Sequence, residues 1–189
     1  FFYETVFNRP IGAWNTSSAE NMVQMFYNNT SFNQIISNWD TSKVEFMTQM
    51  FARTVFNQDI SSWDTSAVRS MFAMFDANSV FNQPIGIWDI SSLTNMSYML
   101  DNASAFDQVL SNWTLNNVNS AVMFARDSGF TQTNFKNTVI AFDNNTSQTA
   151  DFPKYINFSP VISPSTDNAY LTAFFSLESK NFFIRDGDN

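Results

Sequence analysis

A phrase of about 25 residues recurs along this chain, and each copy contains one tryptophan. The five tryptophans fall 25, 24, 25 and 25 residues apart, at Trp14, Trp39, Trp63, Trp88 and Trp113. A fixed period of this length is typical of solenoids, in which each repeat packs on its neighbours and no single repeat folds alone. The repeat therefore predicts one continuous stack, with equivalent residues aligned in columns along it.

Other positions recur in step with the tryptophan. A phenylalanine stands seven residues before it, at Phe7, Phe32, Phe56, Phe81 and Phe106. The next position is Asn8, Asn33, Asn57, Asn82 and then Asp107. An aliphatic residue stands three before it, at Ile11, Ile36, Ile60, Ile85 and Leu110, and methionines follow it, at Met22, Met47, Met71 and Met96 among others. We predict that the apolar columns form the core and that the amide column bridges backbone groups of successive coils.

Within one coil, the pattern predicts a short helix and a strand. Ser42 to Glu45 has the form of a capping box, and the apolar residues at 44, 47, 50 and 51 mark one stripe of a helix. Residues 56–63 then predict a strand whose successive side chains face in and out. The expected fold class is α/β, a β/α solenoid of about five 25-residue coils with a C-terminal α/β capping unit.

Composition removes several function classes. The net charge is −8 and the nine Lys and Arg are scattered, which disfavours binding to nucleic acid or to an anionic membrane surface. No apolar run is long enough to span a bilayer, so direct membrane insertion is not expected. The chain begins within a repeat, and we expect a processed segment or further coils before Phe1.

We expect no enzyme activity, no cofactor and no metal. Histidine and cysteine are absent, which removes imidazole and thiolate chemistry. Asp40, Asp64 and Asp89 follow three of the tryptophans, and we interpret them as Asx turns, with calcium held between coils as the alternative. A glycosidase would need paired carboxylates, whereas only Asp59 lies on the outward strand positions.

The repeat resembles that of the BspA-like surface leucine-rich-repeat family, which is related to the repeat of mycoplasma surface lipoproteins. The motif that carries the resemblance is Val/Leu-x-x-Met-x-x-Met-Phe followed by Phe-Asn-Gln-x-Ile-x-x-Trp-Asp, best seen in residues 32–51, 56–75 and 81–100. Residues 134–142, 168–171 and 182–187 are similar to the ending of that family. The resemblance implies a leucine-rich-repeat-like solenoid over residues 1–126 and a cap over 127–189. It also implies, broadly, a role in adhesion.

Asparagines in Asn-x-Ser/Thr triplets suggest glycosylation if the source is a secreting eukaryote. We expect it most at Asn29 and Asn102, which stand in the predicted loops between helix and strand. Further candidate positions are Asn15, Asn95, Asn145 and Asn157. These triplets favour an extracellular or cell-surface location, a virion surface being a further possibility.

The predicted binding surface lies on two outward columns, four and two residues before each tryptophan. The first reads Pro10, Ile35, Asp59, Pro84 and Val109, and the second reads Gly12, Ser37, Ser61, Gly86 and Ser111. An apolar row beside small residues predicts a shallow trough in which a flat partner buries apolar area. We therefore expect a non-catalytic surface module that binds protein or glycan partners, or copies of itself. The alternative is a structural building block of an extracellular filament, a cell coat or a virion.

Overall fold

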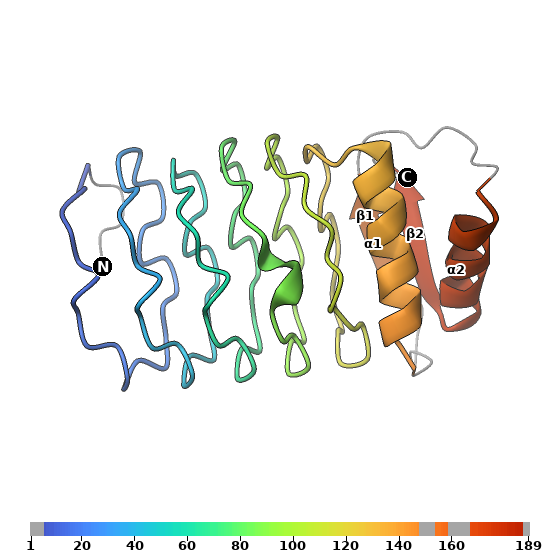
Figure 1. The fold of residues 1–189 in the computed structure, drawn as a ribbon, viewed down its shortest axis with the longest axis horizontal. Helices are drawn as coiled ribbons and strands as arrows, with labels where there is room; N and C mark the ends of the chain where they lie inside the picture. Colours follow the sequence, from blue (N-terminus) through green and yellow to red (C-terminus); the bar gives the residue numbers. More distant parts are fainter. Residues whose placement is uncertain (1–5, 148–153, 159–166, 187–189) are drawn as a thin grey trace.

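The computed structural model describes residues 6–147, 154–158 and 167–186. Along them the chain forms a row of stacked loops, followed at its C-terminal end by two helices and a pair of strands (Figure 1). The elements are the 3-10 helix η1 (Ile85–Ile87), helix α1 (Gln132–Asn145), strand β1 (Lys154–Phe158), helix α2 (Asn168–Ser179) and strand β2 (Phe182–Asp186). Neither described α-helix has the length and apolar character needed to cross a membrane.

The predicted fold class, a leucine-rich-repeat-like β/α solenoid of about five coils, is wrong. Among the described residues before residue 132, no α-helix and no β-strand forms, and neighbouring loops pair through isolated parallel bridges such as Phe46 with Ser70. In place of the helix expected over residues 44–51, the chain forms a bridge at Phe46 and turns from residue 48 on. In place of the strand expected over 56–63, residues 56–60 have no regular secondary structure and 61–62 form a turn. The expected capping box is absent too, because the Glu45 N–H donates to the Glu20 carbonyl at 2.9 Å and not to the Ser42 hydroxyl.

A run of overlapping turns stands where the helix was predicted. The Met50 N–H donates to the Met47 carbonyl at 3.2 Å, and Gln49 and Arg53 have φ values of 54° and 58°. Left-handed backbone costs about 1–2 kcal/mol for a residue other than glycine. It aims alternate N–H groups at carbonyls of the next loop: Met47 at Ser70, Gln49 at Phe72, Phe51 at Met74 and Arg53 at Asp76. The hydrogen bonds that a helix would close internally are therefore made between loops.

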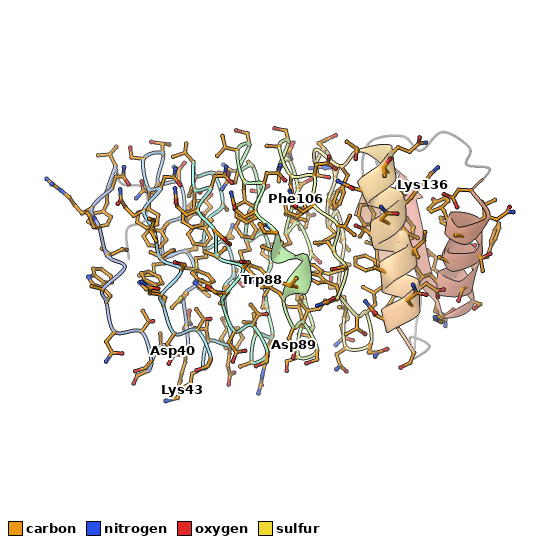
Figure 2. All side chains as sticks on the ribbon, in the orientation of Figure 1. Asp40, Lys43, Trp88, Asp89, Phe106 and Lys136 are labelled. Atoms are coloured by element: carbon orange, nitrogen blue, oxygen red, sulfur yellow. The ribbon has the colours of Figure 1, made fainter. Side chains whose placement is uncertain are left out.

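Aromatic columns fill the interior of the stack, and Figure 2 shows Trp88 and Phe106 among them. Trp39, Trp63, Trp88 and Trp113 are at most 3% exposed, and the predicted Ile and Phe columns are buried apart from the half-buried Phe7. Met22, Met47, Met71 and Met96 are buried as well, although they project from turns and not from helices. The prediction of the core columns is confirmed, with Trp14 of the first copy, 46% exposed, as the exception.

Each buried tryptophan also joins two loops by a hydrogen bond. The indole N–H donates at 3.1 Å to a backbone carbonyl of the preceding loop: Trp39 to Ile11, Trp63 to Ile36, Trp88 to Ile60 and Trp113 to Ile85. The rings of Trp39 and Trp63 stack in parallel, with 6.3 Å between their centroids and an interplanar angle of 3°. A buried indole N–H needs a partner, and the constant repeat length provides one in every loop.

The asparagine column also joins successive loops, because each asparagine side-chain oxygen accepts hydrogen bonds from the next loop. The Asn57 side-chain oxygen accepts from the Asn82 backbone N–H and from the Gln83 side-chain amide, both at 2.9 Å. Asn8, Asn33 and Asn82 accept from the next loop in the same way. The predicted bridging is confirmed, although these amides are exposed or half-buried and not fully buried.

We expect Asn57→Ala to lower the free energy of unfolding by about 1–2 kcal/mol, because it leaves the Asn82 N–H without its acceptor. Asn57→Asp is the matched control, since a carboxylate keeps the accepting oxygen. It should stay close to the unmodified protein at pH 7. Urea denaturation of the three proteins measures both effects. An equal loss in the Ala and Asp variants would contradict the bridging role.

The fifth copy departs from the asparagine pattern where the stack meets α1. Asp107 replaces asparagine, and its carboxylate accepts from the Thr131 backbone N–H at 2.7 Å and from the Thr131 hydroxyl at 3.0 Å. Thr131 is the N-cap of α1, and its hydroxyl oxygen accepts from the Asn134 N–H. The substitution therefore converts a loop-to-loop bridge into a support for the first helix.

The C-terminal elements close the last loops with aromatic residues. Strands β1 and β2 pair in parallel, with Ile156 opposite Ile184, and helix α1 packs against α2. Phe158 of β1 is fully buried, and its ring meets those of Phe124, Phe130 and Phe135 edge-on, with centroids 4.9–5.7 Å apart. Apolar surface at this end of the stack is thereby removed from water.

Candidate binding surface

The first predicted column faces solvent along most of its length. Pro10, Ile35, Asp59 and Pro84 are exposed, Ile35 by 66%, and Val109 is half-buried. In the second column Ser111 is exposed, and Gly12, Ser37 and Ser61 are half-buried. We call this column the Ile35 row (Pro10, Ile35, Asp59, Pro84, Val109): four apolar residues and one aspartate, exposed except at the half-buried Val109.

The glycines of the second column do not leave an open trough. Gly86 is buried, and a Cβ atom there would overlap the Val109 carbonyl oxygen of the next loop. A Cβ atom at Gly12 would lie 2.7 Å from the Ile35 carbonyl oxygen. The interpretation of these two residues as trough-formers is wrong, because close approach of neighbouring backbones already accounts for their size.

The recurring aspartates form turns, as predicted. Asp40, Asp64 and Asp89 each accept from the backbone N–H two residues on, at 2.8–3.1 Å. The hydrogen bond from the Ser42 hydroxyl, and then that from the Ser42 N–H, lower the pKa of Asp40. Asp59 likewise accepts from the Ser61 N–H, at 2.9 Å, and this hydrogen bond is the main cause that lowers the pKa of Asp59. Within the described residues, no three acidic side chains gather as metal ligands.

The predicted glycosylation positions differ in exposure. Asn102, Asn15 and Asn145 are exposed and Asn95 is half-buried, whereas the side chain of Asn157 lies outside the described residues. Asn29 is fully buried, so its predicted exposure on a loop is wrong. The Asn29 amide donates to the Phe7 carbonyl at 3.0 Å, and its oxygen accepts from the Phe32 N–H at 3.1 Å. This asparagine belongs to the core of its loop.

A hollow on the face formed by the turns was not predicted. We call it the Ala73 hollow, and its lining residues are Gln49, Arg53, Phe72, Ala73, Asp76, Tyr98 and Asp101. Loops on either side carry the larger Gln49 and Tyr98 at the position equivalent to Ala73. Aligning the copies would have shown this shortening, but only the structure shows that Asp76 and Asp101 lie beside it.

The two aspartates at the hollow differ in how closely an arginine approaches each of them. Arg126 binds Asp101 through two nitrogen–oxygen contacts of 2.9 and 3.0 Å, whereas Arg53 approaches Asp76 only to 3.7 Å. Burial, and then the charge of Asp101, raise the pKa of Asp76, although Arg53 and Arg126 oppose the shift. A buried carboxylate beside another one favours a cationic neighbour.

A family described as "Mycoplasma protein of unknown function, DUF285" matches residues 1–55 and 52–138. These ranges take in well over half of the 189 residues. The chain belongs to the DUF285 family. No curated protein and no solved structure matches it.

DUF285 membership confirms the resemblance to a mycoplasma repeat family in its broad form, whereas the narrower assignment to BspA-like leucine-rich repeats is not confirmed. The match includes the Ile35 row and the Ala73 hollow. It ends at residue 138, within α1, so β1, α2 and β2 lie outside the DUF285 match.

Proposed function

We propose that this DUF285 chain is a non-catalytic module that binds a protein or glycan partner at a cell surface or outside the cell. The observation that carries the proposal is the Ile35 row, where a large aliphatic side chain is 66% exposed on a face built from repeated loops. Exposed apolar surface of this kind favours association, because burying it releases about 25 cal/mol per Å². The absence of histidine and cysteine from the chain is consistent with a role that involves no catalysis.

Hydrogen bonds between loops favour recognition by a preformed surface. Backbone, asparagine and indole bonds connect each loop to the next, so residues such as Ile35 and Asp59 are held at fixed spacing. A surface that is already ordered loses little conformational entropy on binding. A BspA-like adhesive role, with copies of itself among the partners, is the finer form of this proposal.

Replacing Ile35 or Val109 with glutamate tests the surface. We expect the melting temperature to stay nearly unchanged, because Ile35 is exposed and Val109 is half-buried. Binding should weaken at least tenfold, because a charge would have to be desolvated in the contact. Sedimentation velocity at micromolar concentration and a glycan microarray measure self-association and glycan binding, respectively.

Val122→Glu is the matched control, because Val122 is 44% exposed on the face formed by the turns and not in the Ile35 row. It should bind like the unmodified chain. Unfolding of both row variants would show that these side chains belong to the core. Assembly of the unmodified chain into filaments would favour the building-block alternative.

A further inference from the structure

The Ala73 hollow lies next to a pair of hydrogen-bonded glutamine side chains, at the point where this short ladder stops. The Gln24 side-chain amide donates to the Gln49 side-chain oxygen at 2.8 Å, which joins two loops on the face formed by the turns. The ladder ends at Ala73, although the backbone is alike at all these positions, with φ between 51° and 59° at Gln24, Gln49, Ala73 and Tyr98. A longer side chain at Ala73 would therefore fit the same turn.

We propose that the Ala73 hollow binds the guanidinium or ammonium group of a basic side chain, presented by a partner protein. This site is separate from the Ile35 row and does not depend on the function proposed for it. The hollow offers a carboxylate, a side-chain amide and two aromatic rings to an entering group, on Asp76, Gln49, Phe72 and Tyr98.

The carboxylates argue for a cation as the ligand. The Asp76 side chain is only 18% exposed, and its nearest cation, Arg53 Nε, is 3.7 Å away on a side chain that is 58% exposed. Arg126 binds Asp101 at 2.9 Å, and its charge also lowers the pKa of Asp76. A guanidinium or ammonium group entering the hollow would approach Asp76 directly, and such charge-assisted bonds are stronger than neutral ones. Burial, and then the neighbouring Asp101, raise the pKa of Asp76, and a cation in the hollow would oppose both effects.

Two aromatic rings supply the remaining contacts. Phe72 and Tyr98 meet edge to face, with centroids 5.6 Å apart and an angle of 61°, and both side chains are half-buried. The faces of aromatic rings attract cations, and the attraction increases where water is partly excluded. The net charge of −8 also draws a basic partner towards the chain from a distance.

A titration of the ¹⁵N-labelled chain with N-acetyl-arginine amide, followed by NMR, tests the proposal. We expect millimolar binding, with the largest shifts at the amides of Ala73, Asp76 and Tyr98. N-acetyl-citrulline amide is the neutral isostere and should bind at least tenfold more weakly. Equal binding of the two compounds, or binding of methyl glucoside at the same amides with equal affinity, would overturn the assignment to a cation.

Two variants separate the hollow from general charge attraction. Asp76→Asn should weaken arginine-amide binding at least tenfold, whereas Asp59→Asn removes the same charge elsewhere, keeps an accepting oxygen for Ser61 and should not. Ala73→Gln should extend the glutamine ladder, fill the hollow and abolish binding while the indole resonances stay unchanged. Unaltered binding in either hollow variant would contradict the proposal.

Discussion

Trp63→Ala is expected to lower the free energy of unfolding by about 3–5 kcal/mol, as for other large aromatic residues of a core. The Trp63 side chain is 3% exposed, and its ring stacks on Trp39 at 6.3 Å and meets Phe51 at 6.1 Å. Truncation also leaves the Ile36 carbonyl without the indole N–H, which donates to it at 3.1 Å. Because each loop packs on its neighbours, the cavity would weaken the contact with the preceding loop.

Trp14→Ala is the control for this result. Trp14 occupies the same position of the first copy and stacks on Trp39 at 6.4 Å, but 46% of it is exposed. We expect Trp14→Ala to lower the free energy of unfolding clearly less than Trp63→Ala does. Chemical denaturation followed by circular dichroism measures both variants. Equal losses would show that burial does not determine the contribution of this column.

Gly86→Ala is expected to destabilise the chain by about 3 kcal/mol, at the upper end of what overpacking costs. A Cβ atom at Gly86 would overlap the Val109 carbonyl oxygen and press on the Cα atom of Leu110, 3.1 Å away. Both obstacles are backbone, which cannot move aside as a flexible side chain can. The Asn112 N–H donates to the Gly86 carbonyl at 2.9 Å, so separating the loops would also lengthen this hydrogen bond.

Ser61→Ala is the matched substitution, because Ser61 stands in the same column and already carries a Cβ atom. Because Ser61 is only half-buried, its replacement by alanine should change the free energy of unfolding by about 0.5 kcal/mol or less. Thermal unfolding of both variants measures the difference. A Gly86→Ala protein as stable as the unmodified one would contradict the close approach of the two loops.

Much of the core could be predicted from residue spacing. Equivalent residues such as Trp39 and Trp63 lie one above the other because the repeat length is constant, and a stack of equal loops can bury them only in columns. The bridging role of Asn57 followed from the same argument, because its amide recurs where backbone donors need partners. Asp40 was interpreted as a turn residue for its chemistry, and the structure confirms it.

The local backbone could not be predicted in this way. Apolar residues at 44, 47, 50 and 51 fit a helix, but they fit equally a run of turns in which the Met50 N–H bonds back to Met47. The two differ in where other donors point, and the acceptor of the Gln49 N–H is Phe72, in the next loop. A pattern read within one segment contains no information about a partner in another loop.

The candidate sites, too, could be predicted from the sequence only in part. The exposure of Ile35 was predicted from its place beside the inward Ile36, whereas the burial of Asn29 was not, because it depends on the Phe7 carbonyl of the preceding loop. The sequence by itself therefore determined the repeat, the core columns and the side-chain chemistry of the turns, which depend on residue type and period. Tertiary structure alone decided between helix and turn, and it placed Asp76 beside Asp101. Both depend on how neighbouring loops share hydrogen bonds and space.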